Sequence, residues 1–128
     1  MQATILFGHG SRDPLWRVPI DMVAQRMLAL DPQCCVRCAF LEITAPDLAS
    51  TTAELAALGV SRITIVPMFL GVGRHAREDL PELVTALQND YPAVRFVLQP
   101  PVGEDARVVD LLAQIALSGT TAKDMAAA

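Results

Sequence analysis

The chain contains two histidines, His9 and His75, and each lies where a predicted strand gives way to a predicted helix. Glycines flank His9 on both sides, and two glycines precede His75 in its loop. Glycine lets the backbone pass close to a ligand, although it is also common in tight turns. Imidazole titrates near neutral pH and binds divalent first-row metals. The pair therefore favours an open metal site or a proton-transfer site, whereas either histidine alone is equally typical of a hydrogen-bonded loop residue.

The elements that position these histidines follow from the hydrophobic periodicity. Four apolar, β-branched runs predict buried strands, and four segments with apolar residues at helical spacing predict helices between them. The expected strands cover 3–7, 35–41, 62–68 and 94–98, and the expected helices cover 15–30, 47–58, 77–89 and 104–117. For the first helix we expect Asp13 as N-cap and Pro14 as first residue, and for the third Glu78 or Asp79 as cap, close to Pro81.

Alternating strands and helices predict an α/β fold: a four-stranded parallel sheet, doubly wound in the flavodoxin-like order 2-1-3-4. We expect one domain over 1–118 and a disordered tail over 119–128. In this order the first and third strands are neighbours, and ligands bind where their carboxyl ends diverge. His9 and His75 would line that crevice, with Glu42 one strand further along the same edge.

Composition excludes several classes of protein. A net charge of −4 argues against general nucleic-acid binding. The chain has no apolar run of about 20 residues and no secretory leader, so we expect a soluble, cytoplasmic protein. The phosphate-binding lysine loop, the dinucleotide glycine motif and the hydrolase nucleophile elbow are all missing.

Three cysteines, Cys34, Cys35 and Cys38, lie within five positions. A structural zinc site needs four ligands at particular spacings, which this cluster does not supply. On a strand, the offset between Cys35 and Cys38 would place them on opposite faces. We interpret them as reduced thiols in or beside a buried strand, with a metal site as the alternative.

Short motifs spread along the chain together resemble the class II chelatases. They are Gly8-His9-Gly10-Ser11-Arg12, Phe40-Leu41-Glu42, Val66-Pro67-Met68-Phe69-Leu70 with Gly73 and His75, Asp79-Leu80-Pro81, and Pro101-Val102-Gly103. Each motif is weak alone, but the ordered set is specific. The sequence is most similar to the short-form sirohydrochlorin cobaltochelatases, and the similarity extends to about residue 117.

The resemblance implies insertion of Co2+ into sirohydrochlorin for cobalamin, while related enzymes insert Fe2+ for sirohaem or Ni2+. It implies that His9 and His75 bind the incoming metal, that one of them accepts a proton, and that Glu42 is the matching acidic residue. The resemblance also implies contacts to the macrocycle from Ala45 and from the loop Leu70, Gly71, Val72, Gly73 and Arg74.

Other expectations concern the ligand and the assembly. Arg12, Arg74 and Arg77 flank the two histidine loops, which suggests an anionic ligand such as the carboxylates of sirohydrochlorin, although solvated surface charge is the alternative. No tightly bound cofactor is expected, because the divalent metal is a substrate. A chain of this size leaves one side of a flat macrocycle uncovered, so we expect a homodimer.

Two alternative functions remain open from the sequence. Gly8-His9-Gly10 is similar to the nucleophile motif of histidine phosphatases, but a glycine replaces the arginine that would clamp the phosphate. The second alternative is a metal or tetrapyrrole carrier that binds without turnover.

Overall fold

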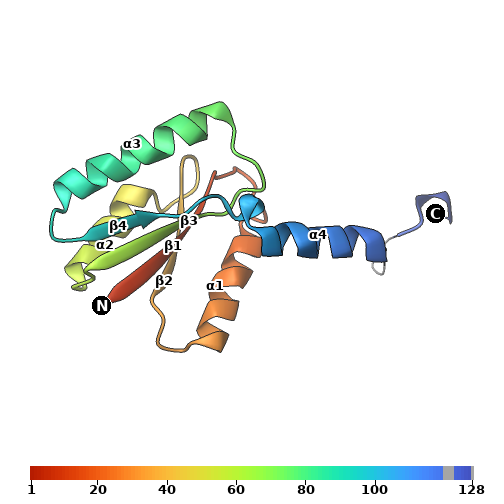
Figure 1. Cartoon of the computed structure of the whole chain (residues 1–128), viewed down its shortest axis with the longest axis horizontal. Coiled ribbons are helices and arrows are strands. Elements are labelled where there is room, and N and C mark those ends of the chain that lie inside the picture. The colour runs from red at the N-terminus through yellow and green to blue at the C-terminus, as the bar shows by residue number, and fades with distance from the viewer. Residues whose placement is uncertain (120–122, 128) are drawn as a thin grey trace.

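A sheet of four parallel strands forms the centre of the molecule, a computed structural model that describes residues 1–119 and 123–127 (Figure 1). The strands are β1 (Gln2–Gly8), β2 (Val36–Phe40), β3 (Arg62–Pro67) and β4 (Arg95–Leu98). Their spatial order is β2-β1-β3-β4, and Ile5 of β1 pairs with Ile65 of β3. The predicted order is confirmed, so the carboxyl ends of β1 and β3 lie side by side.

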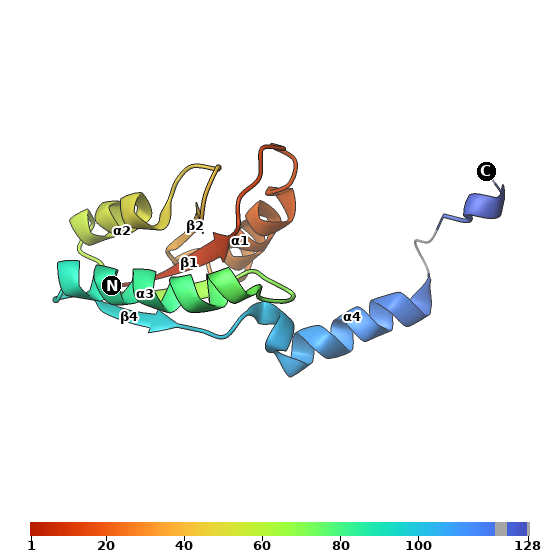
Figure 2. The same cartoon turned by 90° about the horizontal axis from the view of Figure 1, so that it is seen from above.

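Three helices cover this sheet, and the fourth helix leaves it. The helices are α1 (Val18–Leu30), α2 (Leu48–Ala57), α3 (Arg74–Asp90) and α4 (Ala106–Ser118), with short 3-10 turns η1 (Val102–Glu104) and η2 (Met125–Ala127). Helices α2 and α3 pack on one face of the sheet, and α1 packs on the other face over β1 and β2. Helix α4 projects away from the body in both views (Figures 1 and 2).

The core is two-sided, as a parallel sheet requires. The larger cluster, on the α2 and α3 face, includes the fully buried Ile5, Leu55, Ile63 and Ile65. The smaller cluster, under α1, is built from Leu6, Ile20, Val36 and Phe40. The strand β3 ends at Pro67, as predicted, because proline has no N–H to donate to a neighbouring strand.

The predicted start of the first helix was wrong. Helix α1 begins at Val18, with Arg17 as its N-cap and Pro19 in its first turn. The Asp13 carboxylate instead accepts a hydrogen bond from the Leu15 N–H at 2.9 Å, in a turn that precedes the helix. A cap-like sequence therefore stabilises this turn, because the same side-chain to backbone hydrogen bond serves both structures.

The predicted start of the third helix was also wrong. Helix α3 begins at Arg74 after the N-cap Gly73, so Pro81 lies inside the helix. Proline is disfavoured there because it cannot donate to the carbonyl four residues earlier. Burial of Ala76 and Leu80 against the core holds the preceding turn in helical form despite this cost.

Smaller differences occur at other ends. Leu58, predicted on the buried side of the second helix, is the C-cap and is exposed, while Gly59 follows it with a φ of +86° as expected for a C′ glycine. Glu104 belongs to η1 instead of α4. In the predicted tail, 120–122 and 128 lie outside the described residues, and η2 is present beyond the gap.

Candidate active site

The imidazole of His9 is held against an aromatic ring from the neighbouring strand. His9 directly follows β1 and is exposed, and its ring stacks on Phe69 with centroids 4.0 Å apart and planes at 21°. Phe69 is buried just beyond β3, where it contacts Phe7 edge to face. The loop after β3 therefore supports the histidine that follows β1. We predicted no role for Phe69, although it lies in the apolar motif that precedes the glycine loop.

Backbone hydrogen bonds place Glu42 next to His9. The Leu41 N–H donates to the Gly8 carbonyl at 2.9 Å, and the Glu42 N–H donates to the His9 carbonyl at 3.1 Å. Gly10 has a φ of +103°, and a Cβ there would overlap the Glu42 carbonyl. The loops after β1 and β2 are therefore packed backbone to backbone, with Glu42 exposed at the same edge as His9.

A second contact fastens the same two loops. The Ser11 N–H donates to the Thr44 hydroxyl at 2.9 Å, and this hydroxyl donates to the Ser11 carbonyl at 2.9 Å. Ala45, a predicted macrocycle contact, is exposed beside this junction, and its carbonyl accepts from the Arg17 guanidinium at 3.3 Å. This part of the site is thus rigidly connected before any ligand binds.

His75 is the second residue of α3, where its side chain is exposed. The sequence predicts His75 at the end of the loop, but α3 begins earlier than predicted, so His75 has helical backbone. The helix is anchored under this position by the buried Ala76. His9 follows β1 and His75 lies in the first turn of α3, the helix after β3, so both histidines lie beyond the carboxyl ends of two neighbouring strands.

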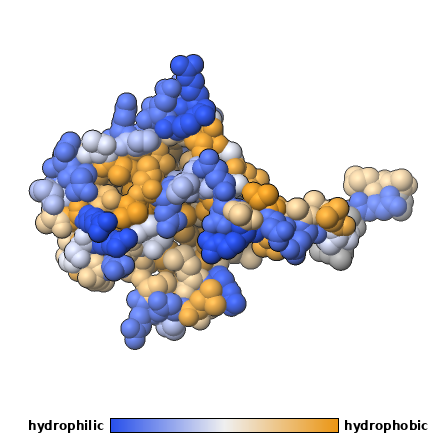
Figure 3. All heavy atoms as spheres, in the orientation of Figure 1, coloured by the Kyte–Doolittle hydropathy of each residue, from blue (hydrophilic) through white to orange (hydrophobic). Residues whose placement is uncertain are grey.

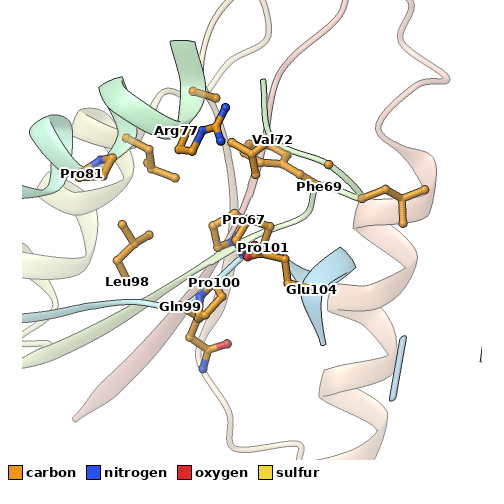
Figure 4. A pocket seen from close by; sticks show the side chains of 14 residues that line it. Pro67, Phe69, Val72, Arg77, Pro81, Leu98, Gln99, Pro100, Pro101 and Glu104 are labelled. Atoms are coloured by element: carbon orange, nitrogen blue, oxygen red, sulfur yellow. The ribbon is translucent and has the colours of Figure 1, made fainter. Parts of the chain in front are cut away.

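A pocket of about 430 Å3 opens between the loop after β3, helix α3 and the loop after β4 (Figure 4). Three predicted macrocycle contacts, Leu70, Gly71 and Val72, line it, and Phe69 joins it to His9. Gly73, Arg74, Ala45 and Arg12 are not among its lining residues. Arg77, which we expected to face an anionic ligand, also lines it, whereas no site was predicted for the other lining residues Leu98, Gln99, Pro100, Pro101 and Glu104.

The arginines around the site differ in their surroundings. Arg77 lines the pocket, which gives it the clearest access to an anionic ligand. Arg74 is exposed and pairs with Glu78 at 3.2 Å, an exposed contact that contributes little to stability. Arg12 is exposed in the loop after His9.

No group of three or more histidine, cysteine or acidic side chains within residues 1–119 and 123–127 is arranged to hold a metal ion. His9, His75 and Glu42 therefore do not form a ready three-ligand cluster in this structure. The three thiols do not form one either, since Cys35 packs on the larger core cluster and Cys38 on the smaller. Burial raises the pKa of the Cys38 thiol, and the nearby Asp21 carboxylate adds to that effect.

Comparison with known proteins identifies the family. A family model described as CbiX matches residues 3–117. The chain belongs to the CbiX family. The family resemblance seen in the motifs is thereby confirmed.

Relatives of known name agree with this assignment. The sirohydrochlorin cobaltochelatase of Methanopyrus kandleri is 32% identical over 132 residues, a match that covers 88% of this chain and 92% of that protein. A cobalamin (vitamin B12) biosynthesis CbiX protein from Marinobacter aquaeolei superposes with a TM-score of 0.83 at 25% identity, covering 96% of this chain and all of the other.

A longer relative shares the same fold. The sirohydrochlorin chelatase SirB from Bacillus subtilis, solved in complex with cobalt, superposes with a TM-score of 0.76 at 26% identity. The match covers 91% of this chain but 50% of SirB.

No helix among the described parts of this chain has the length and apolar character needed to cross a bilayer.

Proposed function

We propose that this CbiX protein is a sirohydrochlorin cobaltochelatase, a lyase-type enzyme that inserts Co2+ into sirohydrochlorin for cobalamin synthesis. The observation that carries the proposal is the position of both histidines at the carboxyl edge of β1 and β3, beside a pocket in a CbiX fold. The names of the M. kandleri relative and of cobalt-bound SirB favour Co2+. Insertion of Fe2+ or Ni2+ is the alternative at the same site.

The proposed chemistry needs a weakly held metal and a base. When the divalent ion enters the ring, two pyrrole N–H bonds break and the four ring nitrogens bind the metal, and the two protons that leave balance the two positive charges that enter. Neutral His9 and His75 would present the metal, and one of them would accept a proton from a pyrrole nitrogen. Two imidazoles with the nearby Glu42 carboxylate leave metal positions open for transfer, unlike a closed structural site.

We also propose where the macrocycle lies. Leu70, Gly71 and Val72 would contact its apolar face along the pocket, with Gly73 and Ala45 on the loops beside it. Arg77, Arg74 and Arg12 would attract its carboxylates. The pocket is too small to enclose a tetrapyrrole, so the ring would extend out of it across the two histidine loops.

We further propose that the enzyme works as a homodimer in the cytoplasm. The chain matches half the length of SirB, so two copies of it would together be about as long as one SirB chain. The three free cysteines suit a reducing compartment.

The proposal is tested by following the absorbance of sirohydrochlorin after Co2+ is added to the parent, His9→Ala, His75→Ala and the double variant. We expect the double variant to lose roughly 100-fold or more of the catalysed rate, as removal of acid–base catalysis typically does. Arg26→Ala, an exposed change on α1 away from this edge, should insert metal like the parent.

Three results would contradict the proposal. They are a double variant as fast as the parent, binding of sirohydrochlorin and metal without acceleration, which would indicate a carrier, and phosphoester hydrolysis, which would indicate a phosphatase. Initial rates with Co2+, Fe2+ and Ni2+ would then identify the preferred metal.

A further inference from the structure

The side chain of Phe69 contacts both the pocket and His9. Its ring stacks on the imidazole, with centroids 4.0 Å apart and planes inclined by 21°. The same residue lines the pocket and is only 4% exposed (Figure 4). His9 itself is exposed, so the stack covers one face of the imidazole and leaves the rest of that ring accessible. Phe69 therefore supports a proposed metal-binding side chain without taking the place of a ligand.

The position of Phe69 is fixed independently of His9. Its ring contacts Phe7 of β1 edge to face, with centroids 6.2 Å apart, and it belongs to the larger core cluster. The backbone just before it is also held, because the Met68 N–H donates to the Phe7 carbonyl at 2.8 Å. An imidazole that stacks on such a fixed ring loses rotational freedom when the chain folds, so that loss is not paid again when a ligand binds.

The loop after β4 holds Phe69 from another side. The Gly103 N–H donates to the Phe69 carbonyl at 2.9 Å, and a Cβ at Gly103 would overlap the backbone of Leu70. A larger residue at position 103 would therefore displace Leu70, and with it the adjoining Phe69. The proposed function gives no role to Gly103, although it ends the Pro101-Val102-Gly103 motif. Its close approach makes it a determinant of where the Phe69 ring lies.

On the pocket side, the surroundings of Phe69 are largely apolar. Apolar side chains gather between α3 and β4 on the face that Figure 3 shows. Those that line the pocket include Leu70, Val72, Leu80 and Leu98. Within residues 1–119 and 123–127, the only cation held over an aromatic ring is Arg17, over Phe40. Arg77 therefore lines the same pocket without competing with His9 for the ring of Phe69.

We propose that Phe69 is a positioning residue for metal insertion that acts through His9, and that Gly103 holds Phe69 in place. The stack raises the fraction of His9 side chains that are already oriented when the metal arrives. An aromatic pair typically shifts such an equilibrium by roughly 2- to 12-fold. The effect on rate rests on the proposed function, whereas the orientation of His9 can be measured without metal or macrocycle.

The first experiment observes the imidazole C–H groups of the full chain by 1H–13C NMR in alkaline buffer, where imidazole side chains are uncharged. Protons above the face of an aromatic ring are shielded, so the His9 signals should lie upfield of those of His75. In the part of the chain that the structure describes, His75 contacts no aromatic ring. Phe69→Leu should move the His9 signals downfield to the range of His75, and Gly103→Ala should move them part of the way.

Phe96→Leu is the matched control. It removes a ring that packs on the same core cluster but contacts neither His9 nor the pocket, so the His9 signals should not move. A His75→Ala chain assigns the signals, since it retains one histidine. If circular dichroism shows that Phe69→Leu does not fold, Phe69→Met takes its place, because methionine adapts to irregular core space. His9 signals that are not upfield in the parent, or that neither variant of Phe69 and Gly103 moves, overturn the inference.

The second experiment measures kcat for insertion of Co2+ at saturating metal and sirohydrochlorin. Phe69→Leu should lower kcat by roughly 2- to 12-fold, and Phe96→Leu should leave it unchanged. In the His9→Ala background, Phe69→Leu should lower the residual rate no further, because the imidazole through which it acts is absent. An equal loss in both backgrounds would mean that Phe69 acts on the macrocycle directly, and it overturns the inference. A parent chain that inserts no metal contradicts the proposed function, and the NMR comparison then still decides whether Phe69 orients His9.

Discussion

At the scale of single residues, the site depends on contacts that fix orientation before any ligand arrives. The stack of His9 on Phe69 limits the rotation of the imidazole, and Phe69 is itself packed on Phe7. Gly10 has a comparable effect on the backbone, because its lack of a Cβ lets the Glu42 carbonyl pack against the loop after β1. The proposed metal-binding residues are thus positioned by neighbours with no chemistry of their own.

Gly10→Ala tests the close approach of the two loops. The φ of +103° and the overlap of the new Cβ with the Glu42 carbonyl should destabilise the fold by at least about 1–3 kcal/mol in urea unfolding. Gly71→Ala is the matched control, since nothing lies within 4 Å of its Cβ position and its change should stay within about 0.5 kcal/mol. Equal stability of the two variants would show that the loops do not pack as described.

At the scale of elements, each end of a helix is set by a specific hydrogen bond or by burial. Asp47 caps α2 by accepting from the Ser50 N–H at 2.8 Å. These hydrogen bonds to Ser50 lower the pKa of the Asp47 carboxyl below its usual 3.8. In α3 burial decides instead, because the first turn forms despite Pro81.

Asp47→Ala should lower the urea midpoint at neutral pH because the cap is lost. Since the folded pKa lies below 3.8, the contribution of the carboxylate is fully present above that pH and is lost as pH falls through the folded value. The difference in urea midpoint between the parent and Asp47→Ala should therefore become smaller as the pH is lowered from 7 to 3. Asp47→Asn can still cap the helix but carries no charge, so it should keep most of the stability at both values. A difference in urea midpoint that grows as the pH falls would contradict this account.

At the scale of the whole molecule, the last helix differs from the body of the fold in how it is packed. Residues up to η1 form a sheet with three packed helices, whereas none of the residues of α4 is buried. A 13-residue helix is marginal in water without packing. A helix of this length that projects from the body therefore needs a surface on which to pack its apolar side.

If the chain works as the proposed homodimer, its thermal stability depends on protein concentration. The midpoint for the parent should rise by roughly 3–5 °C for each tenfold increase, because association favours the folded dimer. Scanning calorimetry over a hundredfold range of concentration checks this, and a midpoint that does not change with concentration would contradict the dimer.

The sequence by itself determined the strand order and the edge at which His9 and His75 lie, because periodicity and connection rules are local or topological, and its motifs indicated the family by resemblance. It did not reveal Phe69 under His9, since stacking depends on how two loops meet in space. It placed the start of α3 too late, because Pro81 is a local signal and the burial of Ala76 and Leu80 is not. Only the tertiary structure decided that α4 leaves its own sheet: an amphipathic pattern shows that a helix needs a surface, and the path of the chain determines whose surface that is.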